Sequence, residues 1–243
     1  AMYDNQSGSF NSVLGRNAAT YNTTGSNNTA IGSDALFSNK AGSNATAVGF
    51  GAMENTNITT TPFNNTNVAV GYQALRGSTD PNANTGNENT AIGYQSLWSN
   101  TEGENNTAIG QFALVSNTTG SNNTTLGGAT LGSNETGSSN SVLGAQAMYD
   151  NFSGSGNTAI GMNALIGNIQ GNNNAAIGKD ALFTNNSGNN ATALGYGAMQ
   201  YANNAETPFA NTNVAVGFEA LRGSANPSSP AGLDNTVTGY HAL

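Results

Sequence analysis

The amino-acid sequence predicts an all-β fold, a parallel β-solenoid (β-roll) built from coils of 17 residues. The motif N-[ST]-[AV]-[ILV]-G recurs along the whole chain, and repetition on this scale is typical of a solenoid or array. Its closing glycines are 17 residues apart except at four places, where the spacing is 22. These glycines are Gly15, Gly32, Gly49, Gly71, Gly93, Gly110, Gly127, Gly144, Gly161, Gly178, Gly195, Gly217 and Gly239.

Each 17-residue coil reads G-x-x-A-L-x-x-N-x-x-G-x-x-N-T-A-I when the closing glycine is placed first. Two segments have strand character: T-A-I before the glycine, and A-L with the residue after it. Gly and Asn, which accept positive φ in tight turns, separate the two segments. The apolar residues form no i, i+3, i+4 stripe, so an amphipathic helix is excluded. The sequence therefore predicts a solenoid with two short sides.

Stacking of the coils, about 4.8 Å apart, would place each residue above its equivalent in the next coil. We expect one apolar column of Ile residues and one of Leu residues in the core. The Asn before each T-A-I segment would form a ladder that satisfies side-chain amides and turn backbone from coil to coil. The residues expected to build this structural ladder are Asn28, Ile31, Gly32, Leu36, Asn106, Ile109, Gly110 and Leu114.

A longer period lies over the 17-residue repeat. The segment beginning at Ala1, A-M-Y-D-N, returns at Ala147, an offset of 146 residues that equals six coils of 17 and two of 22. The chain 1–243 is thus expected to be a single solenoid segment of a longer repeat array, with a second copy of the eight-coil super-repeat starting near 147. The long coils carry five extra residues in a wide turn, and insertions in solenoids form loops that often bind ligands. All five prolines lie in them: Pro62, Pro81, Pro208, Pro227 and Pro230.

Aromatic residues follow the closing glycine only on the coils that bracket the long turns. Two interpretations stay open: the rings pack beneath the long turns, or they form a ladder on which a glycan stacks. Arg76 and Arg222 occupy equivalent places beside the long turns and either hold a loop by hydrogen bonds or contact an acidic ligand. The candidate ligand-binding residues are Phe50, Tyr72, Arg76, Tyr94, Tyr196, Phe218, Arg222 and Tyr240.

Composition and charge narrow the function classes. Charged residues make up 7% of the chain and the net charge is -8. The five basic residues are dispersed, so the chain lacks the electrostatic footprint of a nucleic-acid-binding protein. No apolar run reaches the length of a membrane-spanning helix, and membrane insertion of this segment is not expected. The absence of Cys and the abundance of small polar residues suit an extracellular, cell-surface or virion location.

Catalytic chemistry is not expected. His241, the single histidine, lies in the last three residues of the sequence, so a Ser-His-Asp triad is not expected. One histidine cannot form a multi-His metal site within one chain, and no cofactor is implied. Acids such as Asp34, Asp180, Asp4 and Asp150 are interpreted as solvated turn charges. One Ile-type and one Leu-type residue per coil make a thin core, which favours association of the chain with copies of itself.

The motifs N-S-V-L-G at residues 140–144 and N-T-A-I-G at residues 106–110 resemble the repeats of trimeric autotransporter adhesin heads. Similar N-T-A-I-G-x-x-A-L arrays look like those of phage and bacterial tail-fibre-like proteins. The resemblance covers essentially the whole chain. It implies a left-handed β-roll, three chains side by side, and display as an adhesive or spacer fibre.

The leading hypothesis is therefore a structural fibre or adhesin segment that serves surface attachment or rigid spacing, with itself as partner and a surface glycan or host receptor as a further partner. The alternative is a carbohydrate-binding receptor module that uses the aromatic residues at the long turns. An ice-binding solenoid, suggested by a column of Thr residues, and a tailspike glycanase are less favoured by the same sequence.

Overall fold

The computed structural model describes residues 1–56, 58–201, 207–223 and 234–242. Two compact units, Ala1–Asn122 and Asn123–Leu243, are considered one after the other. The part of the last predicted long turn that contains Pro227 and Pro230 lies outside the described residues, as does Leu243.

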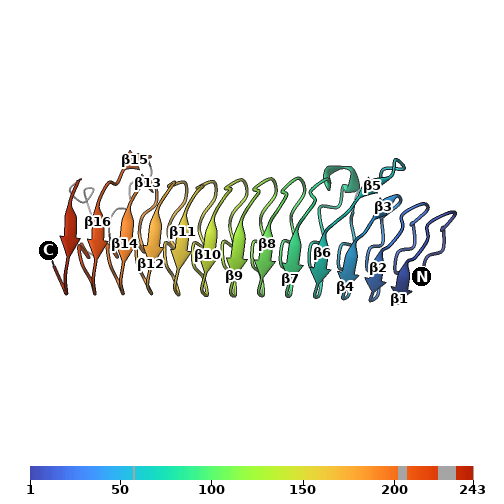
Figure 1. Cartoon of the computed structure of the whole chain (residues 1–243), viewed down its shortest axis with the longest axis horizontal. Helices are drawn as coiled ribbons and strands as arrows, with labels where there is room; N and C mark the ends of the chain where they lie inside the picture. Colours follow the sequence, from blue (N-terminus) through green and yellow to red (C-terminus); the bar gives the residue numbers. More distant parts are fainter. Residues whose placement is uncertain (57, 202–206, 224–233, 243) are drawn as a thin grey trace. The chain divides into compact units, whose positions relative to one another are not determined.

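Six three-residue strands form one parallel sheet in the first unit, with one strand in each coil (Figure 1). Each strand is the T-A-I segment of its repeat, which confirms that prediction. Equivalent residues pair from coil to coil. Thr29 is in register with Thr46, and Thr46 is in register with Val68 although 22 residues separate them. The strands are β1 (Ser12–Leu14), β2 (Thr29–Ile31), β4 (Thr46–Val48), β6 (Val68–Val70), β7 (Thr90–Ile92) and β8 (Thr107–Ile109).

The second unit repeats this arrangement with seven parallel strands. The register again follows the coil, with Ser141 opposite Thr158 and Leu143 opposite Ile160. Both units are thus parallel β-solenoids, as the repeat predicts. The strands are β9 (Thr124–Leu126), β10 (Ser141–Leu143), β11 (Thr158–Ile160), β12 (Ala175–Ile177), β14 (Thr192–Leu194), β16 (Val214–Val216) and β17 (Thr236–Thr238).

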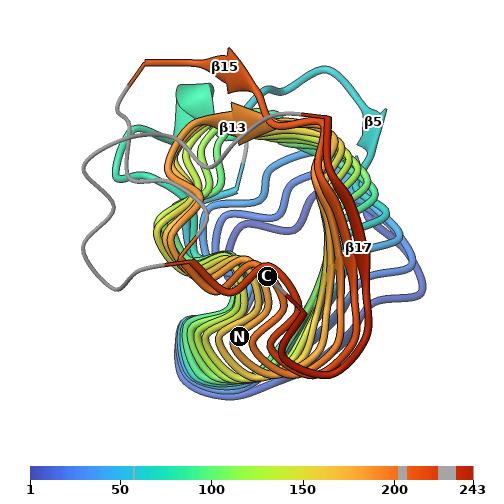
Figure 2. The ribbon, with the colours of Figure 1, turned by 90° about the vertical axis from the view of Figure 1, so that its left-hand side faces the viewer.

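Each unit also contains a pair of short parallel strands, two residues each, beside its first long turn. In the first unit β3 (Gly42–Ser43) pairs with β5 (Phe63–Asn64), and in the second β13 (Gly188–Asn189) pairs with β15 (Phe209–Ala210). In the view of Figure 2, β5, β13 and β15 lie at the upper edge of their coils. Helical structure among the described residues is confined to the 3₁₀ turn η1 (Pro81–Ala83).

The prediction of a second strand at A-L is wrong. Asp34 and Leu36 have φ values of 60° and 53°, and the equivalent residues of the other coils repeat this alternation, which an extended strand does not contain. The amides still join the coils, since Leu36 N donates to Ala52 O and Asp34 N donates to Arg16 O, each at 2.9 Å. The tightly bent backbone carries the Leu side chain into the core, and these bonds offset the cost of about 1–3 kcal/mol for a left-handed residue.

The predicted Ile column lies on the outside of the coil rather than in the core. Ile31 is 40% exposed and Ile109 is half-buried, whereas Ala30 and Ala108 between Thr and Ile are fully buried. Side chains alternate along a strand, so the outer two residues of a three-residue strand share one face and only the middle one points inward. The core is therefore a column of Ala, with occasional Val or Thr, packed against the buried column that contains Leu36 and Leu114.

Ala159→Leu is expected to lower the free energy of unfolding by about 1–3 kcal/mol, because Ala159 is fully buried and the added atoms overpack the core around it. Thr158→Leu, on the outer face of the same strand, is expected to change it by about 0.5 kcal/mol or less. Thermal unfolding followed by circular dichroism compares the two variants. Equal tolerance of both substitutions would contradict the assignment of the inner face.

Candidate functional site

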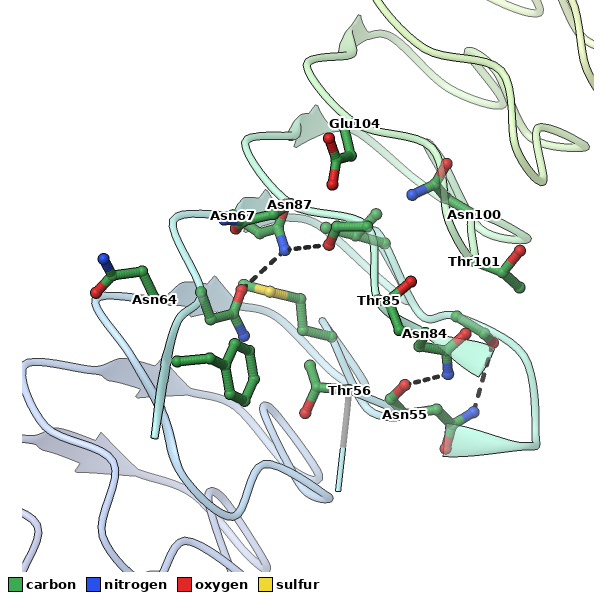
Figure 3. A pocket seen from close by; sticks show the side chains of 16 residues that line it. Asn55, Thr56, Asn64, Asn67, Asn84, Thr85, Asn87, Asn100, Thr101 and Glu104 are labelled. Carbon is green, nitrogen blue, oxygen red and sulfur yellow. Dashed lines mark hydrogen bonds between the residues drawn. The ribbon is translucent and has the colours of Figure 1, made fainter. Parts of the chain in front are cut away.

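The two long turns of the first unit enclose a cavity of about 220 Å³ (Figure 3). Met53, Phe63 and Leu75 supply its apolar wall, and side-chain amides and hydroxyls supply most of the rest. Glu104 contributes the one carboxylate among the lining residues and comes from the next coil. The polar lining residues labelled in Figure 3 are Asn55, Thr56, Asn64, Asn67, Asn84, Thr85, Asn87, Asn100, Thr101 and Glu104.

The apolar wall depends on a glycine. Phe63, in β5, lies against Gly42 of β3, where an added Cβ would come within 2.7 Å of the ring atom Cζ. The second unit repeats the arrangement, with Phe209 against Gly188. A glycine therefore allows the ring to approach the backbone and close one side of the turn.

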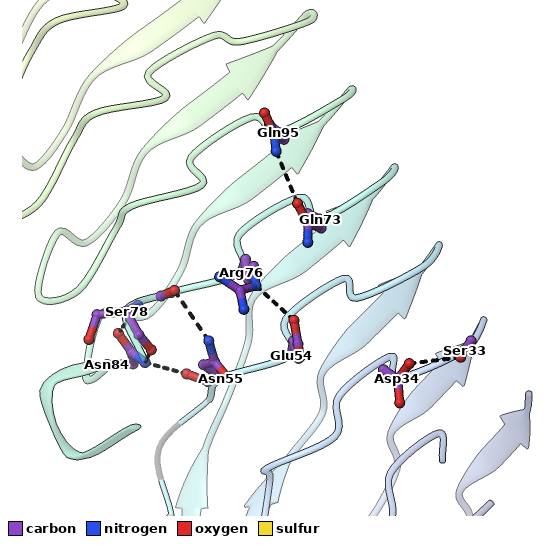
Figure 4. Close-up of polar contacts among 10 residues, drawn as sticks. Ser33, Asp34, Glu54, Asn55, Gln73, Arg76, Ser78, Asn84 and Gln95 are labelled. Carbon is purple, nitrogen blue, oxygen red and sulfur yellow. Dashed lines mark hydrogen bonds and ion pairs between the residues drawn. The ribbon is translucent and has the colours of Figure 1, made fainter. Parts of the chain in front are cut away.

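Hydrogen bonds from the chain itself hold the second long turn in place (Figure 4). The Asn84 side chain donates to Ser78 O at 2.9 Å, accepts from Ser78 N at 2.9 Å, and also donates to Asn55 O of the preceding coil. Within the turn, Asp80 Oδ1 accepts from Asn82 N at 3.0 Å at the start of η1. The wall of the cavity is thus fixed by contacts that need no ligand.

Arg76 and Arg222 brace the coils beside the long turns. Arg76 Nε donates to Glu54 Oε2 at 2.7 Å (Figure 4), and its guanidinium lies 5.8 Å from the Trp98 ring centroid. Arg222 Nε donates to Gln200 Oε1 at 2.9 Å. These contacts favour the interpretation that both arginines hold the turn rather than contact a ligand.

The predicted aromatic residues stack on one another. The ring centroids of Phe50 and Tyr72 are 5.3 Å apart and those of Tyr72 and Tyr94 are 5.1 Å apart, with interplanar angles of 11° and 7°. The second unit repeats the stack with Tyr196, Phe218 and Tyr240 at 5.1 Å. None of the six rings lines the cavity under the long turns, and the first five are 40–44% exposed. The rings thus stack on one another rather than line this cavity, and packing beneath the long turns stays an interpretation.

The middle ring of each stack is covered on both faces by its neighbours, Tyr72 by Phe50 and Tyr94, and Phe218 by Tyr196 and Tyr240. The ring centroids of Tyr94 and Phe112 are 5.2 Å apart in a T-shaped arrangement. A sugar normally stacks on an exposed ring face. Glycan stacking along this ladder stays a prediction, and the covered faces give it little geometric support.

The Asn residues before the strands form a ladder of buried amides. Asn106 Nδ2 donates to Asn89 Oδ1 at 3.1 Å and to Gly120 O at 2.8 Å, while Asn106 N also donates to Asn89 Oδ1. Asn28 bonds in a similar way to Gly42 O and Ala45 N. The amides thus bridge neighbouring coils and satisfy turn carbonyls, which is the structural role that the stacking model assigns to them.

A second Asn ladder was not predicted. Asn117 Nδ2 donates to Asn100 Oδ1 of the preceding coil at 2.8 Å and to Gly120 O at 2.9 Å. Gly120 O therefore accepts from both ladders. Its signal in the sequence is the Asn seven residues after the glycine that opens each 17-residue coil, a residue that also suits a tight turn.

Asp34 and His241 each contact a polar side chain of a neighbouring coil. Asn17 Nδ2 donates to Asp34 Oδ1 at 2.9 Å, and Ser33 Oγ donates to Asp34 Oδ2 at 2.8 Å (Figure 4). His241 Nδ1 lies 3.0 Å from Glu219 Oε2. Among the described residues, no cluster of three His, Cys, Asp or Glu side chains could hold a metal ion. The same part of the chain contains no helix long and apolar enough to cross a membrane.

Asp34→Asn is expected to remove a small, pH-dependent part of the stability. The hydrogen bond from Asn17, with lesser help from Ser33 and Arg16 and against a desolvation penalty, lowers the pKa of Asp34 below its usual 3.8. A depressed pKa in the folded state adds stability that is present above the unfolded pKa and is lost as the pH falls through the folded pKa.

The difference in melting temperature between the wild type and Asp34→Asn should thus be seen at neutral pH, correspond to about 1 kcal/mol or less, and shrink below about pH 4. Glu102→Gln, at an exposed turn residue, is the matched control and should show no such dependence. A difference that grows on acidification would contradict the assignment.

The fold and the contacts place the chain in the class of parallel β-solenoid repeat proteins. Comparison of the chain with protein-family models, with curated proteins and with solved structures found no significant match.

Proposed function

We propose that the chain is a segment of a rigid fibre that is displayed outside the cell or on a virion and serves attachment or spacing. Its coils are left-handed, and three copies lie side by side, as the resemblance to trimeric adhesin heads implies. The observation that carries this proposal is the column of large apolar side chains on the outer face of the strands in each unit.

The outward column is too regular to be incidental. In the second unit five successive members are 38–48% exposed, and in the first unit Ile31 and Ile92 are 40% and 38% exposed. Contiguous exposed apolar surface of this kind marks interaction sites. The exposed members of the second unit are Leu126, Leu143, Ile160, Ile177 and Leu194.

A shallow apolar groove of about 230 Å³ follows part of this column, lined by Leu126, Val142, Leu143 and Ile160 together with Thr124 and Ser141. Solenoids that run parallel have the same rise per coil, so a column on one copy meets equivalent side chains of another copy at every coil. Side-by-side association would bury the column and add apolar area to a core that contains mainly Ala and Leu.

The composition supports display outside the cell. The net charge of -8 favours solubility. Many of the Asn side chains are buried inside the solenoid, where they form the ladders. A host receptor or a surface glycan is the partner that such a fibre would attach to.

Sedimentation equilibrium at micromolar concentration tests the proposal. We expect the wild type to have three times the chain mass of 24.5 kDa. Leu143→Ser with Ile160→Ser should return it to the mass of one chain while the circular-dichroism spectrum is retained, because both side chains point outward. Thr136→Ala, at an exposed turn residue, is the control and should leave the mass unchanged. A wild type that sediments at the mass of one chain would overturn the proposal.

A further inference from the structure

The cavity under the long turns of the first unit has the size and chemistry of a site for one sugar ring. Its volume of about 220 Å³ is below the range of roughly 300–1,000 Å³ typical of pockets for drug-sized ligands. A single six-membered ring with its hydroxyl groups is the kind of ligand that fits such a space, whereas an oligosaccharide would extend out of it.

The chemistry of the lining residues favours a neutral polyol over an ion as the ligand. Amides and hydroxyls both donate and accept hydrogen bonds, as sugar hydroxyls do. The lining residues include no Lys, Arg or His, and the carboxylate of Glu104 disfavours phosphate or sulfate. Met53 and Phe63 offer an apolar surface to the C–H groups of a sugar ring.

Some of the polar lining has no structural use. Thr56 Oγ1 is buried without a hydrogen-bond partner, and an unpaired buried hydroxyl costs about 1–3 kcal/mol. Thr85 lies on the lining with an exposed side chain. By contrast, the side chains of Asn67 and Asn84 are used for structure. Asn67 donates to Gly86 O and accepts from Asn89 N, and Asn84 donates to Ser78 O. The lining therefore contains two kinds of polar residue, those that build the wall and those that face the space.

The second copy of the super-repeat differs from the first at several lining positions. At the 146-residue offset the apolar residues are retained, as the pairs Met53 and Met199, Phe63 and Phe209, and Leu75 and Leu221. Six polar residues are replaced, in the pairs Asn55 and Tyr201, Thr56 and Ala202, Asn64 and Ala210, Asn84 and Pro230, Thr85 and Ala231, and Asn87 and Leu233. The second copy thus supplies substitutions for Thr56 and Thr85 that the repeat itself contains.

From this lining we infer that the first-unit cavity binds one neutral pyranose, such as a single residue of a glycan, through Thr56 and Thr85, with Phe63 as the apolar wall. The site is separate from the aromatic ladder and goes beyond the proposed fibre function. It does not depend on the number of chains in the assembly, so the sedimentation experiment and the binding experiment can fail independently.

Saturation-transfer difference NMR tests the inference with the full chain and four separate probes, the methyl pyranosides of glucose, galactose, mannose and N-acetylglucosamine, each at about 10 mM because single sugars bind weakly. At least one probe should receive saturation from the wild type. The variant T56A/T85A, which carries the residues of the second copy at these two positions, should weaken that binding at least about tenfold. Inorganic phosphate should not compete.

Two further variants make the outcome decisive. Tyr72→Ala with Tyr94→Ala should leave the affinity unchanged, and loss of binding in that variant would place the sugar on the aromatic ladder and overturn the inference. Thr85→Ala alone changes an exposed side chain and should still weaken binding if the double variant fails to fold. No saturation transfer to any of the four probes, or equal affinity of the wild type and the two Thr variants, would also overturn it.

Discussion

Gly161→Ala is expected to lower the free energy of unfolding by more than about 4 kcal/mol. Gly161 closes its coil with a φ of 130°, and an added Cβ would lie 2.6 Å from the carbonyl carbon of Gly178 and 2.9 Å from Lys179 N. Both are backbone atoms of the next coil and cannot move without disturbing the stack. In a chain of this size we expect a fall in melting temperature of about 8 °C or more.

Gly128→Ala is the matched control. This glycine directly follows a closing glycine, has no left-handed φ, and an added Cβ would meet no atom within 4 Å. The substitution should stabilise the chain by about 0.4–1 kcal/mol by restricting the unfolded state. Thermal unfolding of the two variants at one protein concentration makes the comparison. A Gly161→Ala variant that unfolds like Gly128→Ala would show that the closing glycine is not required by close approach of the coils.

Asn140→Leu is the second substitution with a large expected effect, a loss of about 3–5 kcal/mol. Asn140 Nδ2 donates to Asn123 Oδ1 and to Gly154 O, each at 3.0 Å, and its Oδ1 accepts from Asn157 N at 3.0 Å. Leucine has a similar volume but removes all of these side-chain bonds and leaves the buried Asn157 N without its acceptor, whereas Gly154 O keeps the bond from Asn151 and Asn123 Oδ1 keeps the bond from the backbone amide of residue 140. The cost thus exceeds that of one lost hydrogen bond.

Chemical denaturation measures this loss, with Thr136→Ala as the control at an exposed turn residue of the same coil. The control should change the stability by about 0.5 kcal/mol or less. Hydrogen exchange adds a local test, since Asn157 N should lose protection in Asn140→Leu. Retention of wild-type stability by Asn140→Leu would contradict the structural role of the ladder.

The candidate site was only partly predictable. The long turns were recognised from the four spacings of 22, and the aromatic residues beside them were singled out, yet the cavity is lined by neither the aromatics nor the two arginines. Met53, Thr56 and Thr85 come from two successive long coils, and their proximity depends on the path of each turn. A comparison of the two copies of the super-repeat shows that Thr56 and Thr85 are among the lining positions that differ while Met53, Phe63 and Leu75 are retained, but it does not by itself separate them from wall residues such as Asn84.

The sequence by itself determined the repeat, the parallel pairing of the T-A-I strands and the coil spacing, because these follow from periodicity alone. The tertiary structure decided which side chains point inward. Ile looks like a core residue by its hydrophobicity, but a three-residue strand has one inward side chain, and in this narrow coil it is Ala30 rather than Ile31. The structure also decided that the A-L segment bends through left-handed residues, because bonds between stacked coils outweigh the local preference of Leu36.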